Sequence, residues 1–177
     1  MAYLTASGSV KGARVTSTIL LVEDKEDDVR LFQDALAESK LGSALYRCRD
    51  GVEALNYLKG VPHYNDRERF PFPQVLLLEL ELPMVSGWEL LTFVRTRPEW
   101  NSLLVVVLTA SLRVDDLRRA YSMKADSFLT KPCRPQDLQS LANTFPNRWV
   151  ALPDSGQIQL DVRQIANYPH KRNLPLR

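Results

Sequence analysis

The feature that most constrains the fold is a regular alternation between short apolar runs and segments with helical periodicity. The runs TILLV, VLLL and LLVVVLTA are apolar throughout, yet each is too short for a buried helix. Strands of this kind are typical of a parallel sheet covered on both faces. ALYRCRD includes polar positions and is expected near an edge, and DSFLT is the fifth run. The predicted strands are therefore 18–22, 44–50, 75–78, 103–110 and 126–130.

A helical segment follows each of these runs. The first has apolar residues at roughly helical spacing, and Gly42 is predicted to stop it. The others are predicted at 51–60, 88–97, 113–122 and 135–145, with a proline-containing loop at 61–73. Five successive βα units predict an α/β protein with a doubly wound parallel sheet. The spaced apolar residues of the first helix are Val29, Phe32, Leu36 and Leu41.

The length of 177 residues fits one domain. We expect a flexible leader at 1–16, the folded domain at 17–150, and a C-terminal extension without its own fold at 151–177. Within that extension, QIQLDV alternates and is predicted to add a strand to a sheet, for example that of a partner. The net charge is only +2, and nucleic-acid-binding proteins usually carry a concentrated basic face. Direct DNA binding is therefore not expected.

The cysteines and the hydropathy of the sequence indicate in which cellular compartment the protein is expected. The two cysteines, Cys48 and Cys133, lie outside any metal-binding spacing and are expected to be reduced thiols. No apolar run approaches the roughly 18 residues that a membrane span requires, and no signal peptide is expected. The sequence therefore predicts a cytoplasmic protein that does not contact a membrane.

Polar residues stand at the carboxyl ends of four of the predicted strands or directly after them, and in a parallel sheet these ends meet at one site. Carboxylates packed there raise one another's pKa unless a cation neutralises them, and Mg²⁺ prefers oxygen ligands. A hydroxyl and a lysine opposite them suit phosphoryl oxygens. The spacing therefore predicts phosphoryl chemistry. The residues concerned are Glu23, Asp24, Glu79, Thr109 and Lys131.

Four motifs, ILLVEDKEDDVRLFQDAL, LLLELELPMVSGWELL, VVVLTAS and FLTKP, make residues 17–150 resemble the receiver domain of two-component response regulators. The insert at 61–73 and a last helix ending in Trp149 resemble stand-alone receivers that partner phytochrome-type histidine kinases. The resemblance implies a flavodoxin-like (βα)5 fold with a five-stranded parallel sheet in the order 2-1-3-4-5. It also implies phosphorelay signalling through protein–protein interaction, without enzyme activity.

The resemblance implies a role for each site residue. Glu23 and Asp24 match the acidic pair that holds Mg²⁺, beside the acceptor position at Glu79, and Glu81 stands where a backbone carbonyl serves the metal. Mg²⁺ is the cofactor implied. The phosphoryl pocket and its aromatic switch are implied at Thr109, Ala110, Lys131 and Phe128.

Two positions depart from the family pattern. Lys124 stands where a glycine is usual, which predicts a differently shaped loop. Glu79, four residues before Pro83, stands where the family has the aspartate that accepts the phosphoryl group. The added methylene moves the carboxylate by about 1.5 Å, and errors near 1 Å cost on the order of a hundredfold in rate.

Three interpretations of Glu79 follow. It imitates a phosphorylated aspartate by pairing with Lys131 and drawing in Thr109, and the chain is a pseudo-receiver. Alternatively, the chain has lost its acceptor and serves as a fixed binding surface. In the third interpretation, Glu79 or a neighbour retains residual phosphorylation.

A rival from another class is a Mg²⁺-dependent phosphatase or phosphotransferase of another α/β fold, but the first strand ends in EDKEDD, without the spacing of haloacid dehalogenase-type enzymes.

The resemblance places the output surface on the fourth helix, the fifth strand and the fifth helix. We expect a homodimer through this face, and a sensor histidine kinase or a downstream signalling protein as partner. The alternative for the arginine pair on the fourth helix is a solvated helix side. The expected interface includes the segment 137–145 and the residues Arg113, Arg118, Arg119 and Tyr121.

Overall fold

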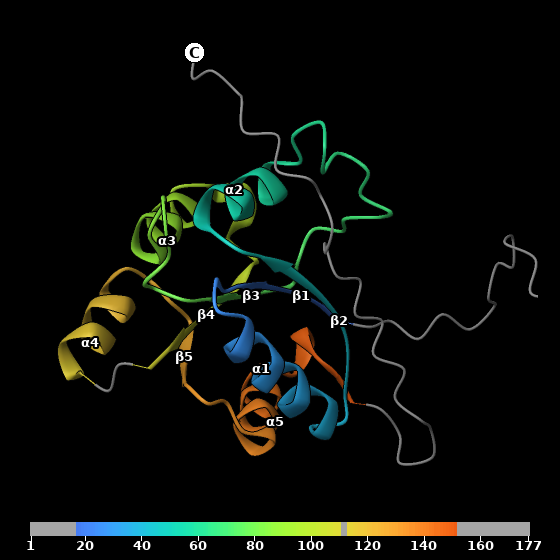
Figure 1. Ribbon diagram of the computed structural model, residues 1–177, viewed down its shortest axis with the longest axis vertical. Helices are drawn as coiled ribbons and strands as arrows, with labels where there is room; N and C mark the ends of the chain where they lie inside the picture. The colour runs from blue at the N-terminus through green and yellow to red at the C-terminus, as the bar shows by residue number, and fades with distance from the viewer. Residues whose placement is uncertain (1–16, 111–112, 152–177) are drawn as a thin grey trace, which may run out of the picture.

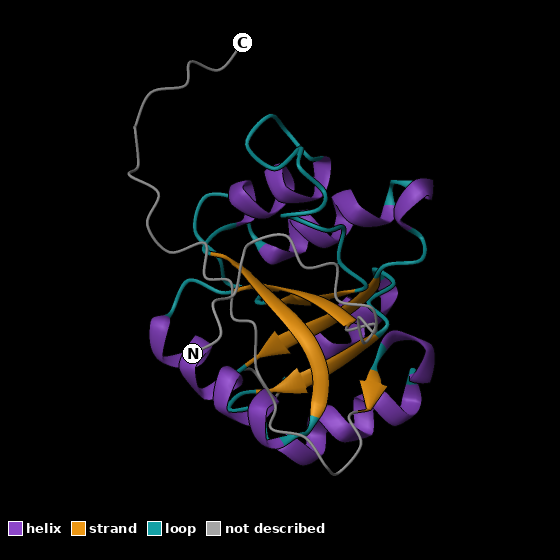
Figure 2. Ribbon diagram, turned by 90° about the vertical axis from the view of Figure 1, so that its right-hand side faces the viewer, coloured by secondary structure: helices purple, strands orange, loops and turns teal. Residues whose placement is uncertain are grey.

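The computed structural model describes residues 17–110 and 113–151, which form one sheet between two layers of helices (Figure 1). Helices α1 and α5 cover one face, and α2 and α3 cover the other (Figures 1 and 2). The strands are β1 Ser17–Val22, β2 Leu41–Cys48, β3 Val75–Leu78, β4 Leu104–Thr109, β5 Ser127–Thr130 and β6 Val150–Ala151. The helices are α1 Glu26–Glu38, α2 Gly51–Lys59, α3 Gly87–Arg95, α4 Val114–Ser122 and α5 Pro135–Thr144, with short 3-10 turns η1 Pro98–Trp100 and η2 Pro146–Arg148.

The sheet confirms the predicted topology. Its order is β5-β4-β3-β1-β2-β6, and the five strands β1 to β5 are parallel in the order 2-1-3-4-5. The sequence pattern did not predict β6, which pairs antiparallel with the start of β2 through Gly42 and Val150. Ala151, assigned above to the C-terminal extension, is therefore the second residue of this short edge strand.

The core lies on both faces of the sheet, which explains why the central strands are apolar throughout. In β1, Ile19 and Leu21 belong to the cluster under α1 and α5, whereas Leu20 and Val22 belong to the cluster under α2 and α3. All four side chains are fully buried. Because successive side chains of a strand point to opposite faces, only a strand covered on both sides needs apolar residues at every position.

Two predicted helix ends are wrong. Gly42 does not stop the first helix, because α1 ends at Glu38 and Gly42 already lies in β2. The hydroxyl of Ser39 donates to the carbonyl of Leu36 at 2.7 Å, and Lys40 turns the chain with a φ of 57°. The last helix does not reach Trp149. It ends at Thr144, and Pro146, which cannot continue a helix, starts η2.

The loop before β5 contains Lys124, the residue predicted above to give this loop a different shape. Lys124 has a φ of 65°, the left-handed conformation that glycine adopts without steric cost. Its N–H donates to the carbonyl of Tyr121 at 2.9 Å, which closes the end of α4. The lysine therefore keeps a backbone conformation suited to glycine.

The predictions for 1–16 and for 152–177, including the strand at QIQLDV, concern residues outside those that the structure describes. In the described part of the chain, no helix combines the length and the apolar character needed to cross a bilayer.

The start of α5 provides a pH-dependent test of the fold. Asp137 accepts hydrogen bonds from the backbone N–H and the guanidinium of Arg134 at 2.8 to 3.0 Å, and these contacts lower its pKa below 3.8. We expect Asp137→Asn to lower the free energy of unfolding at pH 7 by about 0.5–1 kcal/mol.

Because the pKa of Asp137 is depressed in the folded state, its stabilising contribution is present above pH 3.8 and is lost as the pH falls through the folded value. Urea unfolding of the wild type and Asp137→Asn at pH 7 and near pH 3 measures this. An equal difference at both pH values would contradict the assignment.

Candidate functional site

Glu79 follows β3 and is almost fully buried, with both carboxylate oxygens engaged. Its Oε1 accepts from the backbone N–H of Leu80 at 2.6 Å and of Glu81 at 3.0 Å. Its Oε2 forms an ion pair with the Nζ of Lys131. The carboxylate is thus held between the turn that follows its own strand and the lysine that follows β5.

Lys131 is the cation at the centre of the site. Its side chain is 8% exposed, and its Nζ contacts the carboxylates of Glu23 and Glu79 and lies 3.0 Å from Oδ2 of Asp28. Its backbone N–H donates to the carbonyl of Thr109 at 2.9 Å, which fixes it against the end of β4. The structure therefore brings together Glu23, Glu79 and Lys131, as their positions at strand ends predicted.

Asp28 also contacts Lys131, and the sequence pattern did not predict it as a site residue. Asp28 lies in the first turn of α1, directly beyond the end of β1, and is the third carboxylate on Lys131. A helix that starts at a strand end places its first-turn side chains beside that end. Three acids in this turn were the available signal: Glu26, Asp27 and Asp28.

Burial and mutual contact set the proton affinities of this cluster. Burial raises the pKa of the Glu23 carboxyl, and this effect outweighs the lowering by Lys131 and by the N–H of Lys25. Burial alone lowers the pKa of Lys131, but its hydrogen bonds to the three carboxylates raise it above the ordinary lysine value. Lys131 therefore stays charged, and one ammonium faces three carboxylates.

The donor atoms expected for Mg²⁺ are present but not gathered. Among residues 17–110 and 113–151, no three Asp, Glu, His or Cys side chains form a metal-binding group. Asp24 is exposed, and its carbonyl accepts from Arg47 at 3.1 Å, while Glu23 and Glu79 both contact Lys131. The oxygen-rich donor set suits a hard cation in its chemistry. In this arrangement, Lys131 is the counter-ion of the Glu23 and Glu79 carboxylates.

Helix α3 packs directly on the backbone of Glu79 and Leu80. The N–H of Gly87 donates to the carbonyl of Leu80 at 3.0 Å. A Cβ at Gly87 would lie 2.1 Å from the carbonyl oxygen of Glu79, so only glycine fits there without a shift. Ser86 and Glu89 form a capping box that starts the helix at this point. The turn that carries Glu79 is therefore closed tightly by α3.

The remaining predicted pocket residues lie in or directly after β4 and β5. Thr109 ends β4 and is 4% exposed, and Ala110 follows it on the surface. Phe128 of β5 is partly buried and packs against the core cluster under α2 and α3. Tyr121 of α4 contacts the ring of Phe128 edge-on, with centroids 5.9 Å apart. This contact links α4 to the strand that leads to Lys131.

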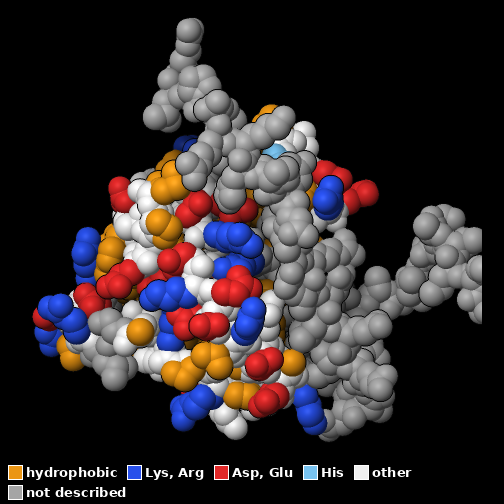
Figure 3. All heavy atoms as spheres, viewed as in Figure 1, with side chains coloured by type: hydrophobic (Ala, Val, Ile, Leu, Met, Phe, Trp, Pro, Cys, Tyr) orange, Lys and Arg blue, Asp and Glu red, His pale blue; other side chains and the backbone are white. Residues whose placement is uncertain are grey.

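The residues at and before α4 that were predicted as an interface differ in environment. Arg113 and Arg118 are exposed, and Arg118 pairs with Asp115 at 3.8 Å. The guanidinium of Arg119 lies 4.2 Å from the centre of the Trp88 ring, at the start of α3, so this arginine packs on a neighbouring helix. Tyr121 is 50% exposed. Figure 3 shows acidic and basic side chains intermingled on the face in view.

Known proteins resemble this chain in sequence and in fold. The family model of the response regulator receiver domain matches residues 19–143. The response regulator Rcp1 of Synechocystis sp. is 35% identical over 132 residues, which cover 75% of this chain and 88% of Rcp1. The probable methanogenesis regulatory protein FilR2 of Methanothrix harundinacea is 35% identical over 150 residues, covering 85% and 94%.

Solved structures give the same result. The bacteriophytochrome response regulator RtBRR matches with a TM-score of 0.69 and 33% identity, covering 80% of this chain and 84% of RtBRR. The Mn²⁺-bound form of Rcp1 matches with a TM-score of 0.62 and 35% identity, covering 77% and 99%.

Proposed function

Since the chain belongs to the response regulator receiver domain family of two-component signalling, we propose that it acts as a pseudo-receiver in which Glu79 imitates a phosphorylated acceptor. The observation that carries this proposal is the ion pair between Glu79 and Lys131 at the acceptor position. In the proposal, Lys131 binds the carboxylate in place of a phosphoryl oxygen. A carboxylate has one negative charge where a phosphoryl group has nearly two, so the imitation is partial.

The surroundings of Glu79 favour the mimic over an inert surface. An inert surface needs no contact between Glu79 and the cluster, whereas Glu79 is buried and bonded through both oxygens. The packing of Phe128 against the core and its contact with Tyr121 suit a switch aromatic turned inward. Residual phosphorylation is disfavoured because the amides of Leu80 and Glu81 and the ammonium of Lys131 already engage the carboxylate oxygens.

The output in this proposal is a protein–protein contact in the cytoplasm, without binding to DNA. The face formed by α4, β5 and α5 is the proposed homodimer surface, with Arg113, Arg118 and Tyr121 among its exposed residues. A sensor histidine kinase or a downstream signalling protein is the proposed partner. Arg119 packs on Trp88 and so joins α4 to α3, which helps to hold α4 in place within this surface.

A divalent cation fits the proposal as a second counter-ion. Glu23, Asp24 and Glu79 would hold Mg²⁺ with their carboxylates, and Glu81 with its backbone carbonyl. The ion would supply positive charge to a cluster in which three carboxylates share one ammonium. Rcp1, which is similar to this chain, has been solved in a Mn²⁺-bound form.

Phosphorylation by a small donor tests the proposal. We expect the wild-type protein, incubated with Mg²⁺ and acetyl phosphate, to show no stoichiometric gain of a phosphoryl group by intact-protein mass spectrometry. A receiver domain with an aspartate at the acceptor position, treated in parallel, confirms that the donor is active. A stoichiometric gain on the wild-type chain would contradict the pseudo-receiver proposal.

A further inference from the structure

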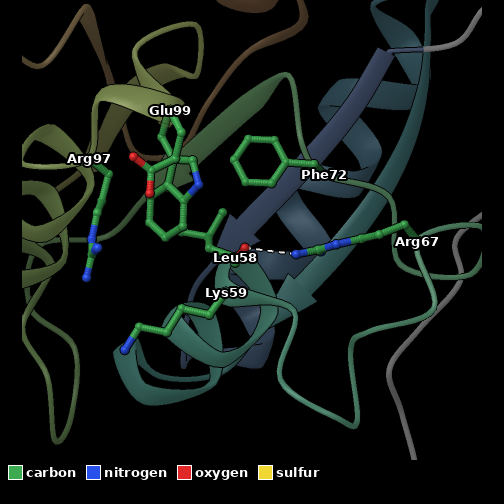
Figure 4. A pocket seen from close by; sticks show the side chains of 7 residues that line it. Leu58, Lys59, Arg67, Phe72, Arg97 and Glu99 are labelled. Carbon is green, nitrogen blue, oxygen red and sulfur yellow. Dashed lines mark hydrogen bonds between the residues drawn. The ribbon is translucent and has the colours of Figure 1, made fainter.

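A pocket of about 380 Å³ lies at the opposite end of the sheet from Glu79 (Figure 4). Glu79 follows the carboxyl end of β3, whereas this pocket lies where α2 ends and where η1 leads into β4. The segment between α2 and β3, which holds the insert at 61–73, supplies part of its wall. The lining residues are Leu58, Lys59, Arg67, Phe72, Arg97, Glu99 and Trp100.

Two cations of this pocket, Lys59 and Arg97, form no ion pair with an acid among residues 17–110 and 113–151. Lys59 Nζ lies 4.7 Å from the centre of the Phe93 ring, and the guanidinium of Arg97 lies 4.8 Å from it. In the described part of the chain, neither forms an ion pair, and Glu99 forms none either. Lys59, Arg67 and Arg97 outnumber Glu99 in the lining, and this excess of positive charge gives the pocket a positive potential.

Arg67 has a structural role that favours an anion here. Its guanidinium donates to the carbonyls of Tyr57, Leu58 and Phe70 at 2.9 to 3.2 Å. The first two are carbonyls at the end of α2, whose partial negative charge would repel an anion. Gly60 leaves room for this arginine, because a Cβ there would lie 2.5 Å from its Nη2. Arg67 thus neutralises the partial negative charge of the α2 carbonyls. The positive charges of Lys59 and Arg97 can then pair with a ligand.

The rest of the lining is apolar and aromatic. The rings of Phe72 and Trp100 lie with centroids 5.9 Å apart and tilted by 43°, and Leu58 lines the pocket with them. Figure 4 shows Arg97 and Glu99 on one side of the pocket and Phe72 and Arg67 on the other. Ligand pockets of this size combine such apolar walls with a few polar groups that orient the ligand.

We propose that this pocket binds a small aromatic anion. The planar ring of the ligand packs against Phe72 and Trp100, and its anionic group pairs with Lys59 and Arg97. The carboxylate of Glu99 accepts a hydrogen bond from an N–H or O–H of the ligand. A nucleoside monophosphate and an aromatic carboxylate share this chemistry.

Titration followed by NMR tests the proposal on the full chain. The probes are AMP, 4-hydroxybenzoate, adenosine without a phosphate, and inorganic phosphate without a ring. We expect saturable shifts of the Trp100 indole N–H with AMP or with 4-hydroxybenzoate, and their comparison identifies the class of anion. The indole signals of Trp88 and Trp149 serve as internal controls. Absence of saturation with both aromatic anions, or equal binding of adenosine or phosphate, would overturn the proposal.

Substitution of the two cations identifies the site. Lys59→Gln and Arg97→Gln are each expected to raise the Kd about fivefold, the usual effect of one exposed ion pair. Both side chains are exposed, so the fold should be unaffected, which thermal unfolding checks. Arg69→Gln is the matched control, because it removes the same charge from the exposed insert but lies outside the pocket lining. An equal loss of affinity in this control would show unspecific attraction and reject the pocket.

Discussion

The Glu79→Asp variant is expected to accept a phosphoryl group from acetyl phosphate with Mg²⁺ at a rate on the order of a hundredfold above the wild type. The shorter side chain withdraws the carboxylate by about 1.5 Å from Lys131. That withdrawal breaks the direct ion pair and leaves space for a phosphoryl group between the carboxylate and the ammonium. The backbone around the site is unchanged, since Gly87 packs on the carbonyl of residue 79 and not on its side chain.

Intact-protein mass spectrometry over a time course measures this rate. Glu79→Gln is the matched control: it keeps the length of the side chain, removes its charge and provides no acceptor, so it should gain no phosphoryl group. Similar rates for the wild type and Glu79→Asp would show that the length of the side chain does not limit the chemistry. Phosphorylation of Glu79→Gln would place the acceptor on another residue.

The second large effect is expected from Lys131→Met, which removes the only ammonium among three carboxylates of the described cluster. We expect the free energy of unfolding to fall by about 3–5 kcal/mol at pH 7, the usual result of removing one partner of a buried ion pair. Urea unfolding in the presence of EDTA measures this. Lys25→Met is the control, since it removes an exposed ammonium beside the same acids and should cost less than about 0.5 kcal/mol.

The loss in Lys131→Met should depend on pH and on divalent cations. The pKa of Glu23 is already raised in the folded protein, so its contribution to stability grows as the pH falls from neutral towards the unfolded value of 4.5. Because protonation of Glu23 relieves the repulsion, the deficit of the variant should shrink over that range. Mg²⁺ should also reduce the deficit if it acts as a second counter-ion. A deficit below about 1 kcal/mol would show that Lys131 is not needed to balance the cluster.

The convergence of three side chains on one edge of the sheet could be predicted from the sequence for a topological reason. In a parallel sheet, the residues after neighbouring strands meet at one edge, so Glu23, Glu79 and Lys131 follow from the strand assignment. To predict the position of Asp28, the start of α1 would have to be known to within one turn. The spacing of apolar residues defined only the body of that helix. Similarly, the packing of Arg119 on Trp88 joins α4 to α3, and such a contact leaves no local pattern in the chain.

The errors at element ends have a common cause. Glycine often ends a helix, and Gly42 follows an apolar helical pattern, but Ser39 and Lys40 already turn the chain before it. The strand β6 is only two residues long, so its existence depends on the exposed edge of β2. Local propensity therefore identified the five parallel strands and the five α-helices, while their ends depended on hydrogen bonds made by single side chains and on neighbouring strands.

The three hydrogen bonds of Arg67 have a consequence for how related chains can diverge. They join the insert to the end of α2, and the hydroxyl of Tyr57 donates from that helix to the carbonyl of Pro71 at 2.9 Å. The insert is therefore part of the helix end and not a separable addition. A relative that shortens this segment must replace the cap of α2 in the same step. The length of the insert and the last turn of α2 should consequently vary together during evolution.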